Sequence, residues 1–454
     1  MIRRLLLAGI ILFAGCAETE RPAVSERAAL APLPPMRSFA VRRAAAPVRS
    51  NASIAADFLQ LSFELESGRA LPVFTRFEGP VTVRVTGAAP ERLLLDLDRL
   101  LARLRDEAGI DITRVPAARG ASITVELVPS GEMRRIVPQA ACFVVPRLGS
   151  WAEFRARRRS DDLDWTTLTE RERLAVFIPE GVAPQEMRDC LHEEIAQALG
   201  PLNDLYALPD SVFNDDNFNA VLTGFDMLIL RTTDAPELRS GMTREEVAAR
   251  LPAVLARLNP AGERRRVAER DATPREWVRA VETALGPRAS DRRRRAAAAE
   301  AVRIARARGW EDSRLAFALY ALGRLSLPER PDVALGSFLE AGSIYAASPD
   351  TQLQSGHVAM QLAAYALSSG QPEAAIEIVD AHLGPVAEAE NAALLATLLM
   401  VKAEALATLG QPAEAREVRA ESLGWARYGF GTEAEVRARA EEVSALAPPP
   451  GERS

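Results

Sequence analysis

The chain has 454 residues, of which 48% are hydrophobic and 26% are charged, and its formal net charge is -6 at pH 7. This length is enough for two or three domains that each bury a core, and we expect two. The negative balance gives no general attraction to nucleic acid or to an acidic membrane surface, so no nucleic-acid partner is expected.

The first sixteen residues have the layout of an export signal. Arg3 and Arg4 precede an apolar run at residues 5–13, which is too short to span a bilayer as a helix. Ala14-Gly15-Cys16 resembles the lipobox of bacterial lipoproteins, in which the cysteine is acylated and becomes the new N-terminus. The alternative is an ordinary secretory signal in which Cys16 is incidental.

We therefore predict a lipoprotein signal peptide at residues 1–16, with Cys16 as the lipidation site. Residue 17 is not the aspartate that commonly retains such lipoproteins at the inner membrane. The resemblance thus implies a lipid-anchored, periplasm-facing protein of the cell envelope, at the outer membrane. Residues 17–50 are rich in alanine, proline and arginine without periodicity, which predicts a flexible tether.

Helix and strand patterns alternate from residue 53 to residue 258. Apolar residues recur at helical spacing in residues 54–64 and 91–108. Period-two alternation or short apolar runs predict strands at residues 81–85, 123–127, 141–145 and 173–178. This order of elements indicates an α+β domain.

The helix that Pro184 opens carries the most informative motif of the chain. In active zincins the pattern H-E-x-x-H supplies two zinc ligands and a general base, and metzincins add a glycine turn and a third histidine. On that frame, the ligand slots hold Glu193, Gln197 and Asn203, the base slot holds Glu194, and the turn holds Gly200. Ser211-Val212-Phe213 then stands where metzincins have a turn that ends in methionine.

These residues, together with Leu222-Thr223-x-x-Asp226 and Gly241-Met242, resemble a family of exported bacterial proteins known as domain of unknown function 2927. That family is itself similar to metzincin peptidases that have lost metal ligands. The resemblance implies a degenerate, zincin-like domain at residues 51–260. It also implies that a helix at residues 222–230 packs beneath the site.

The residues in the ligand slots are poorly suited to zinc. The chain has three histidines, and only His192 is near the motif, about 100° around an ideal helix from Glu193. Neither zinc nor any other cofactor is therefore expected. We favour a buried polar cluster that keeps the geometry of the lost site, and the alternative is an oxygen site for calcium or magnesium. If the domain is an enzyme, Glu194 is the candidate general base.

A dense acidic group, Asp210, Asp215 and Asp216, follows the motif. Carboxylates in this density usually belong to solvated turns. The alternative is that they bind a cation or a basic peptide, together with the neighbouring Asn214 and Asn217.

Apart from Cys16, the chain has two cysteines, Cys142 and Cys190. An even pair in an exported protein predicts a disulfide, which would link a strand to the start of the motif helix. The alternative is two buried free thiols.

After residue 260 the strand patterns stop and a helical repeat begins. Pro331, Pro372 and Pro412 recur about every forty residues at predicted helix starts, and Gly370 and Gly410 stand at predicted helix ends. The section is similar to tetratricopeptide repeats, so we predict TPR-like, all-α repeats at residues 285–446 and a disordered tail at 447–454. Its tyrosines and tryptophans are interpreted as inter-helix core; they are Trp310, Tyr320, Tyr345, Tyr365 and Trp425.

The sequence therefore predicts a lipid-anchored envelope scaffold or adaptor. Its protease-like domain is expected to be catalytically inactive, and its repeats are expected to bind a protein or peptide partner. The alternative is a lipid-anchored, metallopeptidase-like hydrolase that uses Glu194 as general base with an atypical metal site.

Overall fold

A computed structural model describes residues 32–40, 42–138, 140–266 and 271–448. The predicted signal peptide with Cys16, and residues 449–454 of the predicted tail, lie outside these residues. The chain divides into two compact units: an α/β unit that holds most of residues 42–273, and a helical unit that holds residues 32–40 and 274–448.

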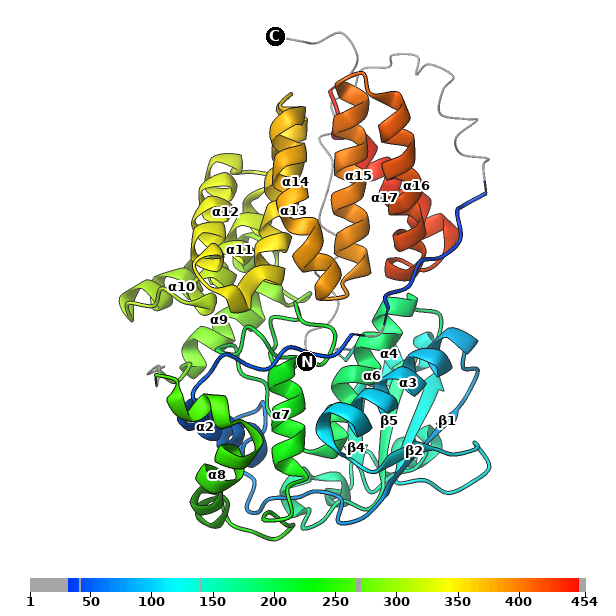
Figure 1. The fold of residues 1–454 in the computed structure, drawn as a ribbon, viewed down its shortest axis with the longest axis vertical. Coiled ribbons are helices and arrows are strands. Elements are labelled where there is room, and N and C mark those ends of the chain that lie inside the picture. Colours follow the sequence, from blue (N-terminus) through cyan, green and yellow to red (C-terminus); the bar gives the residue numbers. More distant parts are fainter. Residues whose placement is uncertain (1–31, 41, 139, 267–270, 449–454) are drawn as a thin grey trace. The chain divides into compact units, whose positions relative to one another are not determined.

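The α/β unit is built on a five-stranded sheet (Figure 1). The strand order is β2-β1-β3-β5-β4, and every neighbouring pair is parallel except β4 with β5. The strands are β1 (Val81–Thr86), β2 (Ile112–Arg114), β3 (Ile123–Val128), β4 (Phe143–Pro146) and β5 (Leu174–Pro179). The four strands predicted from the sequence are confirmed, and β2 was missed because it has only three residues.

The unit mixes helices and strands, as the sequence predicts, and its sheet is mostly parallel, which makes it an α/β unit. Helix α3 (Glu91–Arg103), continued by η1 (Leu104–Ala108), carries the chain from β1 to its parallel neighbour β2. Such a crossover is what parallel pairing requires. The separate strand patterns did not reveal whether neighbouring strands run parallel.

The α/β unit has further helices, which contribute buried apolar residues to its cores. They are α2 (Asn51–Phe63), α4 (Ser130–Ile136), α5 (Trp151–Arg157), α6 (Pro184–Leu199), α7 (Gly224–Thr233) and α8 (Arg244–Leu258). Short 3-10 turns lie at η2 (Asp161–Leu163), η3 (Trp165–Thr167) and η4 (Pro260–Arg264). Alternate residues of β5 enter two different cores, because successive side chains of a strand point to opposite faces: Val176 lies in the larger core, whereas Phe177 packs with Phe143, Trp151 and Phe154.

The segment that leads into α2 is packed onto the α/β unit. The backbone N of Ala44 donates to the carboxylate of Glu107 (3.0 Å), and the Arg49 side chain forms two ion pairs. A Cβ on Gly224 would collide with the carbonyl oxygen of Ala45, so the segment passes directly over the start of α7. These contacts are not those of the flexible tether predicted for residues 17–50.

The helical unit is a succession of helices in which neighbours along the chain pack together (Figure 1). They are α9 (Arg275–Leu285), α10 (Asp291–Ala307), α11 (Ser313–Ser326), α12 (Pro331–Ala346), α13 (Gln352–Ser368), α14 (Pro372–Glu388), α15 (Ala392–Thr408), α16 (Pro412–Gly429) and α17 (Glu433–Ser444), with the 3-10 turn η5 (Pro349–Thr351) before α13. The repeat prolines begin α12, α14 and α16, as predicted. Helix α9 precedes the repeats predicted from residue 285.

Three of the five aromatic residues interpreted as core are buried: Trp310, Tyr320 and Tyr345. Tyr365 is 44% exposed, so that interpretation was wrong. Trp425 is half-buried and stacks on a segment outside the repeats. Among the described residues, no helix combines the length and apolar character needed to cross a membrane.

Candidate functional site

Helix α6 carries the motif residues and is fixed near its middle and at its C-terminal end. Near its middle, Cys190 forms a disulfide with Cys142, which directly precedes β4, and the two Cα atoms are 5.9 Å apart. The predicted bridge is therefore present. It ties the helix to the antiparallel edge strand of the sheet, so the motif helix cannot move independently of that strand.

The C-terminal end of α6 is held by Arg171, a residue that sequence analysis did not single out. Its guanidinium donates to the carbonyl oxygens of Gln197, Ala198 and Gly200, and the distance to the Ala198 oxygen is 2.8 Å. These are groups that a helix end leaves without partners, and a cation at this position also complements the helix dipole. Burial lowers the pKa of Arg171 to about 9, so the group is charged at neutral pH.

Gly200 is needed for close approach to α7. Its φ lies outside the left-handed region, and a Cβ at this position would meet the Thr233 side chain at 2.9 Å. The sequence suggested that Gly200 allows a sharp turn. In the structure it allows the chain that leaves α6 to pass close to α7.

The polar residues of the ligand slots differ in what they contact. Asn203 is buried; its amide nitrogen donates to the Gln60 carbonyl (3.2 Å), and its oxygen accepts from the backbone N of Asp204 (3.1 Å). The Asn203 side chain thus links the backbone at Gln60 to the backbone at Asp204. Gln197 and the base-slot residue Glu194 are also buried on α6, whereas Glu193 is half-buried.

His192 points away from the ligand slots. Its Nδ1 accepts a hydrogen bond from the backbone N of Leu222 (3.1 Å), and Arg103 donates to the carbonyl oxygen of Leu222 (3.0 Å). Burial lowers the pKa of His192 well below its ordinary value, and the charges of Arg103 and Arg188 lower it further. The histidine is therefore neutral and positions the chain that enters α7.

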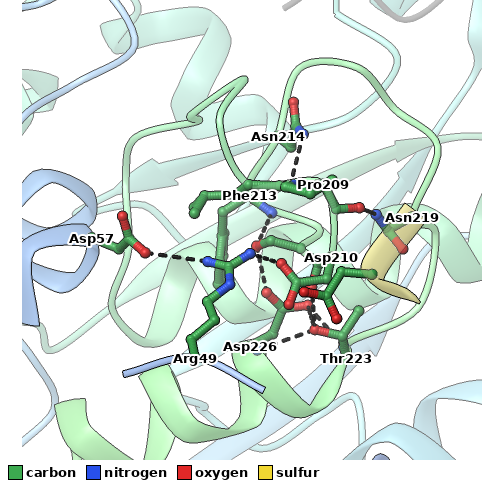
Figure 2. Close-up of polar contacts among 12 residues, drawn as sticks. Arg49, Asp57, Pro209, Asp210, Phe213, Asn214, Asn219, Thr223 and Asp226 are labelled. Carbon is green, nitrogen blue, oxygen red and sulfur yellow. Dashed lines mark hydrogen bonds and ion pairs between the residues drawn. The ribbon is translucent and has the colours of Figure 1, made fainter. Parts of the chain in front are cut away.

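The Ser211-Val212-Phe213 turn is organised by Asp226, which is fully buried on α7 (Figure 2). Ser211 Oγ donates to Asp226 Oδ1 at 2.5 Å, and the backbone N of Val212 donates to Oδ2 at 3.2 Å. The same carboxylate accepts from the backbone N of Thr223 (2.8 Å), which completes the capping box of α7. Phe213 is fully buried in the core.

The three aspartates of the acidic group are separated by the fold. Asp210 pairs with Arg49, whose other terminal nitrogen contacts Asp57 at 3.2 Å (Figure 2). Asp216 is buried in a tight turn, where it accepts from the Asn214 side chain (2.9 Å) and from the backbone N of Phe218 (3.1 Å). Neither group is a solvated carboxylate.

Asp215 instead joins Glu66 and Asp204 in a cluster that we call the carboxylate cluster. One oxygen from each of these three residues lies within 4.8 Å of the others. Glu66 lies in the loop after α2, and sequence analysis missed it because nothing in its neighbourhood marks it. The approach of a residue far along the chain is a property of the tertiary fold.

Burial and mutual repulsion both raise the pKa values of carboxylates in this cluster. Burial, followed by the charges of Glu66, Asp215 and Glu193, raises the pKa of Asp204 well above its ordinary value. Burial and the charge of Asp215 likewise raise the pKa of Glu66. The charge of Glu193, in the first ligand slot, therefore acts on this cluster.

The carboxylate cluster fits a hard cation better than zinc. It supplies oxygens only, which suits calcium or magnesium, and Asp204 Oδ1 is buried with no hydrogen-bond partner among the described residues. No histidine belongs to it, because His192 is engaged with Leu222. Any ion held there would be bound by Glu66, Asp204 and Asp215.

These features define an α/β unit with a disulfide-linked motif helix, a carboxylate-organised turn and a cluster of partly buried acids. Residues 51–253 of it match a family model described as "Protein of unknown function (DUF2927)". The match agrees with the resemblance drawn from the motif residues. No curated protein and no solved structure matches the chain.

Proposed function

We propose that the chain is a lipid-anchored, periplasm-facing adaptor of the cell envelope. In this proposal the α/β unit is a metzincin-like domain that is catalytically inactive, and the TPR-like helical unit binds a protein or peptide partner. The order of elements, the motif frame on α6 and the turn held by Asp226 support the metzincin-like interpretation.

The observation that carries the proposal is the role of the side chains in the expected metal site. Asn203 binds the backbone at Gln60 and Asp204 with both ends of its amide, and His192 binds Leu222. The two other histidines, His357 and His382, belong to α13 and α14 of the helical unit. A catalytic zinc site uses about three protein ligands, most often histidines, and this arrangement lacks them.

The inactive interpretation is tested by metal analysis and by a peptidase screen. Purified full-length protein should retain no stoichiometric zinc and should hydrolyse no peptide substrate. Glu194→Gln is the matched variant, because it keeps the size of the side chain and removes the base. One tightly bound zinc per molecule, or an activity that Glu194→Gln abolishes, would contradict the proposal.

The adaptor role is tested by crosslinking in cells. The variant Glu193→Gln/Glu194→Gln should retain the same crosslinked partners as the unaltered chain, because binding is assigned to the helical unit. If these substitutions change the partners, or convert a transient contact into a trapped one, the α/β unit acts on a substrate. The lipid anchor is tested separately by labelling with a fatty-acid analogue, which Cys16→Ser should prevent.

A second proposal is a hydrolase that uses Glu194 as general base with an atypical metal site, and the carboxylate cluster is the feature that favours it. Glu194 is buried on α6 beside Glu193, whose charge acts on Asp204 of the cluster. This proposal requires activity that depends on added calcium or magnesium. Loss of that activity in Asp204→Asn as well as in Glu194→Gln would support it against the adaptor.

A further inference from the structure

The helical unit holds an extended segment of its own chain against one face of α16. Residues 34–39, which we call the docked segment, have no helix or strand structure and lie beside α16 (Figure 1). Sequence analysis placed them in a flexible tether. Their contacts are instead specific in both main chain and side chain.

The main chain of the docked segment is fixed at two points. The backbone N of Arg37 donates to the carbonyl oxygen of Gly424 (2.9 Å), and Arg427 donates to the carbonyl oxygen of Pro34 (2.8 Å). Gly424 permits this approach, because a Cβ there would meet the Arg37 side chain at 3.1 Å and the Pro35 oxygen at 3.2 Å. The glycine thus opens the helix surface to an extended backbone.

Two side chains of the docked segment are recognised by side chains one turn apart on α16. Phe39 stacks on Trp425, with ring centroids 4.4 Å apart and an interplanar angle of 25°. The Arg37 guanidinium pairs with Glu421 at 2.9 Å and also lies 5.8 Å from the centre of the Trp425 ring. Residues three and four apart share one helix face, so Glu421, Gly424 and Trp425 form a single surface.

This surface has the parts of a peptide-binding site. It offers an aromatic platform, a carboxylate for an arginine, a main-chain acceptor and a donor for a peptide carbonyl. Stacked helical repeats commonly use their extended surfaces for binding. The positions of Glu421 and Trp425 therefore suit a peptide that has an arginine and, two residues later, an aromatic residue.

The docked segment is held by contacts that are easily exchanged. The Arg37 and Glu421 side chains are 50% and 40% exposed, and exposed ion pairs contribute little to stability. A segment without regular structure of its own releases at low cost. Its covalent attachment nevertheless gives it a high local concentration, so an outside peptide has to compete with it.

We propose that the face of α16 formed by Glu421, Gly424, Trp425 and Arg427 is a peptide-binding site, and that residues 34–39 are its resident ligand. A partner reaches the site by displacing them with an extended peptide that presents an arginine and an aromatic residue at the same spacing. This inference rests on the proposed protein-binding role of the helical unit and names the surface and the ligand chemistry.

The test uses the full-length chain and a fluorescent peptide with the sequence of residues 32–40. Binding is measured by fluorescence anisotropy to the unaltered chain and to Arg37→Ala/Phe39→Ala, in which the resident ligand is weakened. The double variant should bind the peptide at least tenfold more tightly. Adding Glu421→Arg to that variant should abolish binding, and a control peptide with alanine at the arginine and phenylalanine positions should not bind.

Release is measured independently by cleavage after Arg37 with an arginine-specific protease, mapped by mass spectrometry. Cleavage should be slow in the unaltered chain and at least fivefold faster in Trp425→Ala and in Glu421→Arg, the second of which changes only an exposed side chain. Equal cleavage in all three chains, together with no peptide binding by the double variant, would overturn the proposal. A concentration-dependent dimer that protects Arg37 would overturn resident docking within one chain.

These outcomes are distinct from those that test the proposed function. A peptidase activity would contradict the adaptor proposal, but it would not decide whether α16 binds a peptide. Failure of peptide binding would remove this site and leave the zinc and peptidase results unchanged.

Discussion

Ser211 Oγ donates a 2.5 Å hydrogen bond to Oδ1 of Asp226, and the other oxygen of the same buried carboxylate accepts from the backbone at Val212 and Thr223. One side chain therefore joins the turn after the motif helix to the start of α7. The pair thus fixes the Ser211-Val212-Phe213 turn against α7.

Asp226→Ala should strongly destabilise the α/β unit. The methyl group accepts no hydrogen bond, so the N–H groups of Val212 and Thr223 then lack a partner. Two such losses cost about 2–5 kcal/mol, which chemical denaturation followed by tryptophan fluorescence would detect. Asp98→Asn is the control, because Asp98 is an exposed partner of Arg114 and should change stability little.

Arg171→Met should loosen the end of α6. The substitution retains much of the buried volume but leaves the carbonyl oxygens of Gln197, Ala198 and Gly200 without their donor, at a cost of about 3 kcal/mol or more. Hydrogen exchange should accelerate in the last turn of α6 and remain unchanged in α10. Arg171→Lys should recover only part of the protection, because an ammonium cannot reproduce the guanidinium fork; full recovery would show that charge alone suffices.

His192 should make the protein less stable in mild acid. Its folded-state pKa is lowered, so the unfolded chain takes up a proton below about pH 6.5 that the folded chain resists, and stability falls with falling pH. His192→Asn retains an acceptor for the backbone N of Leu222 and does not titrate. Denaturation between pH 7 and pH 5 should show a smaller fall in this variant; an unchanged slope would rule out His192 as the cause.

Asp204 should make the protein less stable as pH rises, which is the opposite of the effect of His192. The measurement uses buffer that contains a chelator. Its folded-state pKa is raised, so its contribution to stability is present below its ordinary value of 3.8 and is lost as pH rises through the folded value. Asp204→Asn should therefore gain stability over the unaltered chain as pH rises toward neutrality. Glu237→Gln is a control of opposite sign, because its hydrogen bond to Arg257 lowers the pKa of Glu237. A gain at Asp204 that is independent of pH would contradict the repulsion argument.

Periodicity predicted much of the local structure. The strands β1, β3, β4 and β5, the long apolar helix before β2 and the proline-started helices α12, α14 and α16 all lie where their patterns indicate. Cysteine pairing was also predicted, because an even number of cysteines in a chain with an export signal favours a disulfide. These features depend on neighbouring residues or on residue type alone.

The contacts of the site were harder to predict. Arg171, Arg49 and Glu66 have no sequence pattern around them, and each acts on residues far along the chain. Asp210, Asp215 and Asp216 look alike in sequence, yet the fold gives one a salt bridge, one a place in the carboxylate cluster and one a buried turn. The parallel pairing of most strands has the same origin.

The sequence by itself determined where helices and strands form, which cysteines pair and which residues stand in the ligand slots, because periodicity, turn residues and residue chemistry act over short stretches. Only the tertiary structure decided that Asn203 and His192 bind backbone, that three distant carboxylates meet, and that residues 34–39 dock on α16. Each of these depends on chain segments brought together by burial of the cores, and no local pattern encodes that approach.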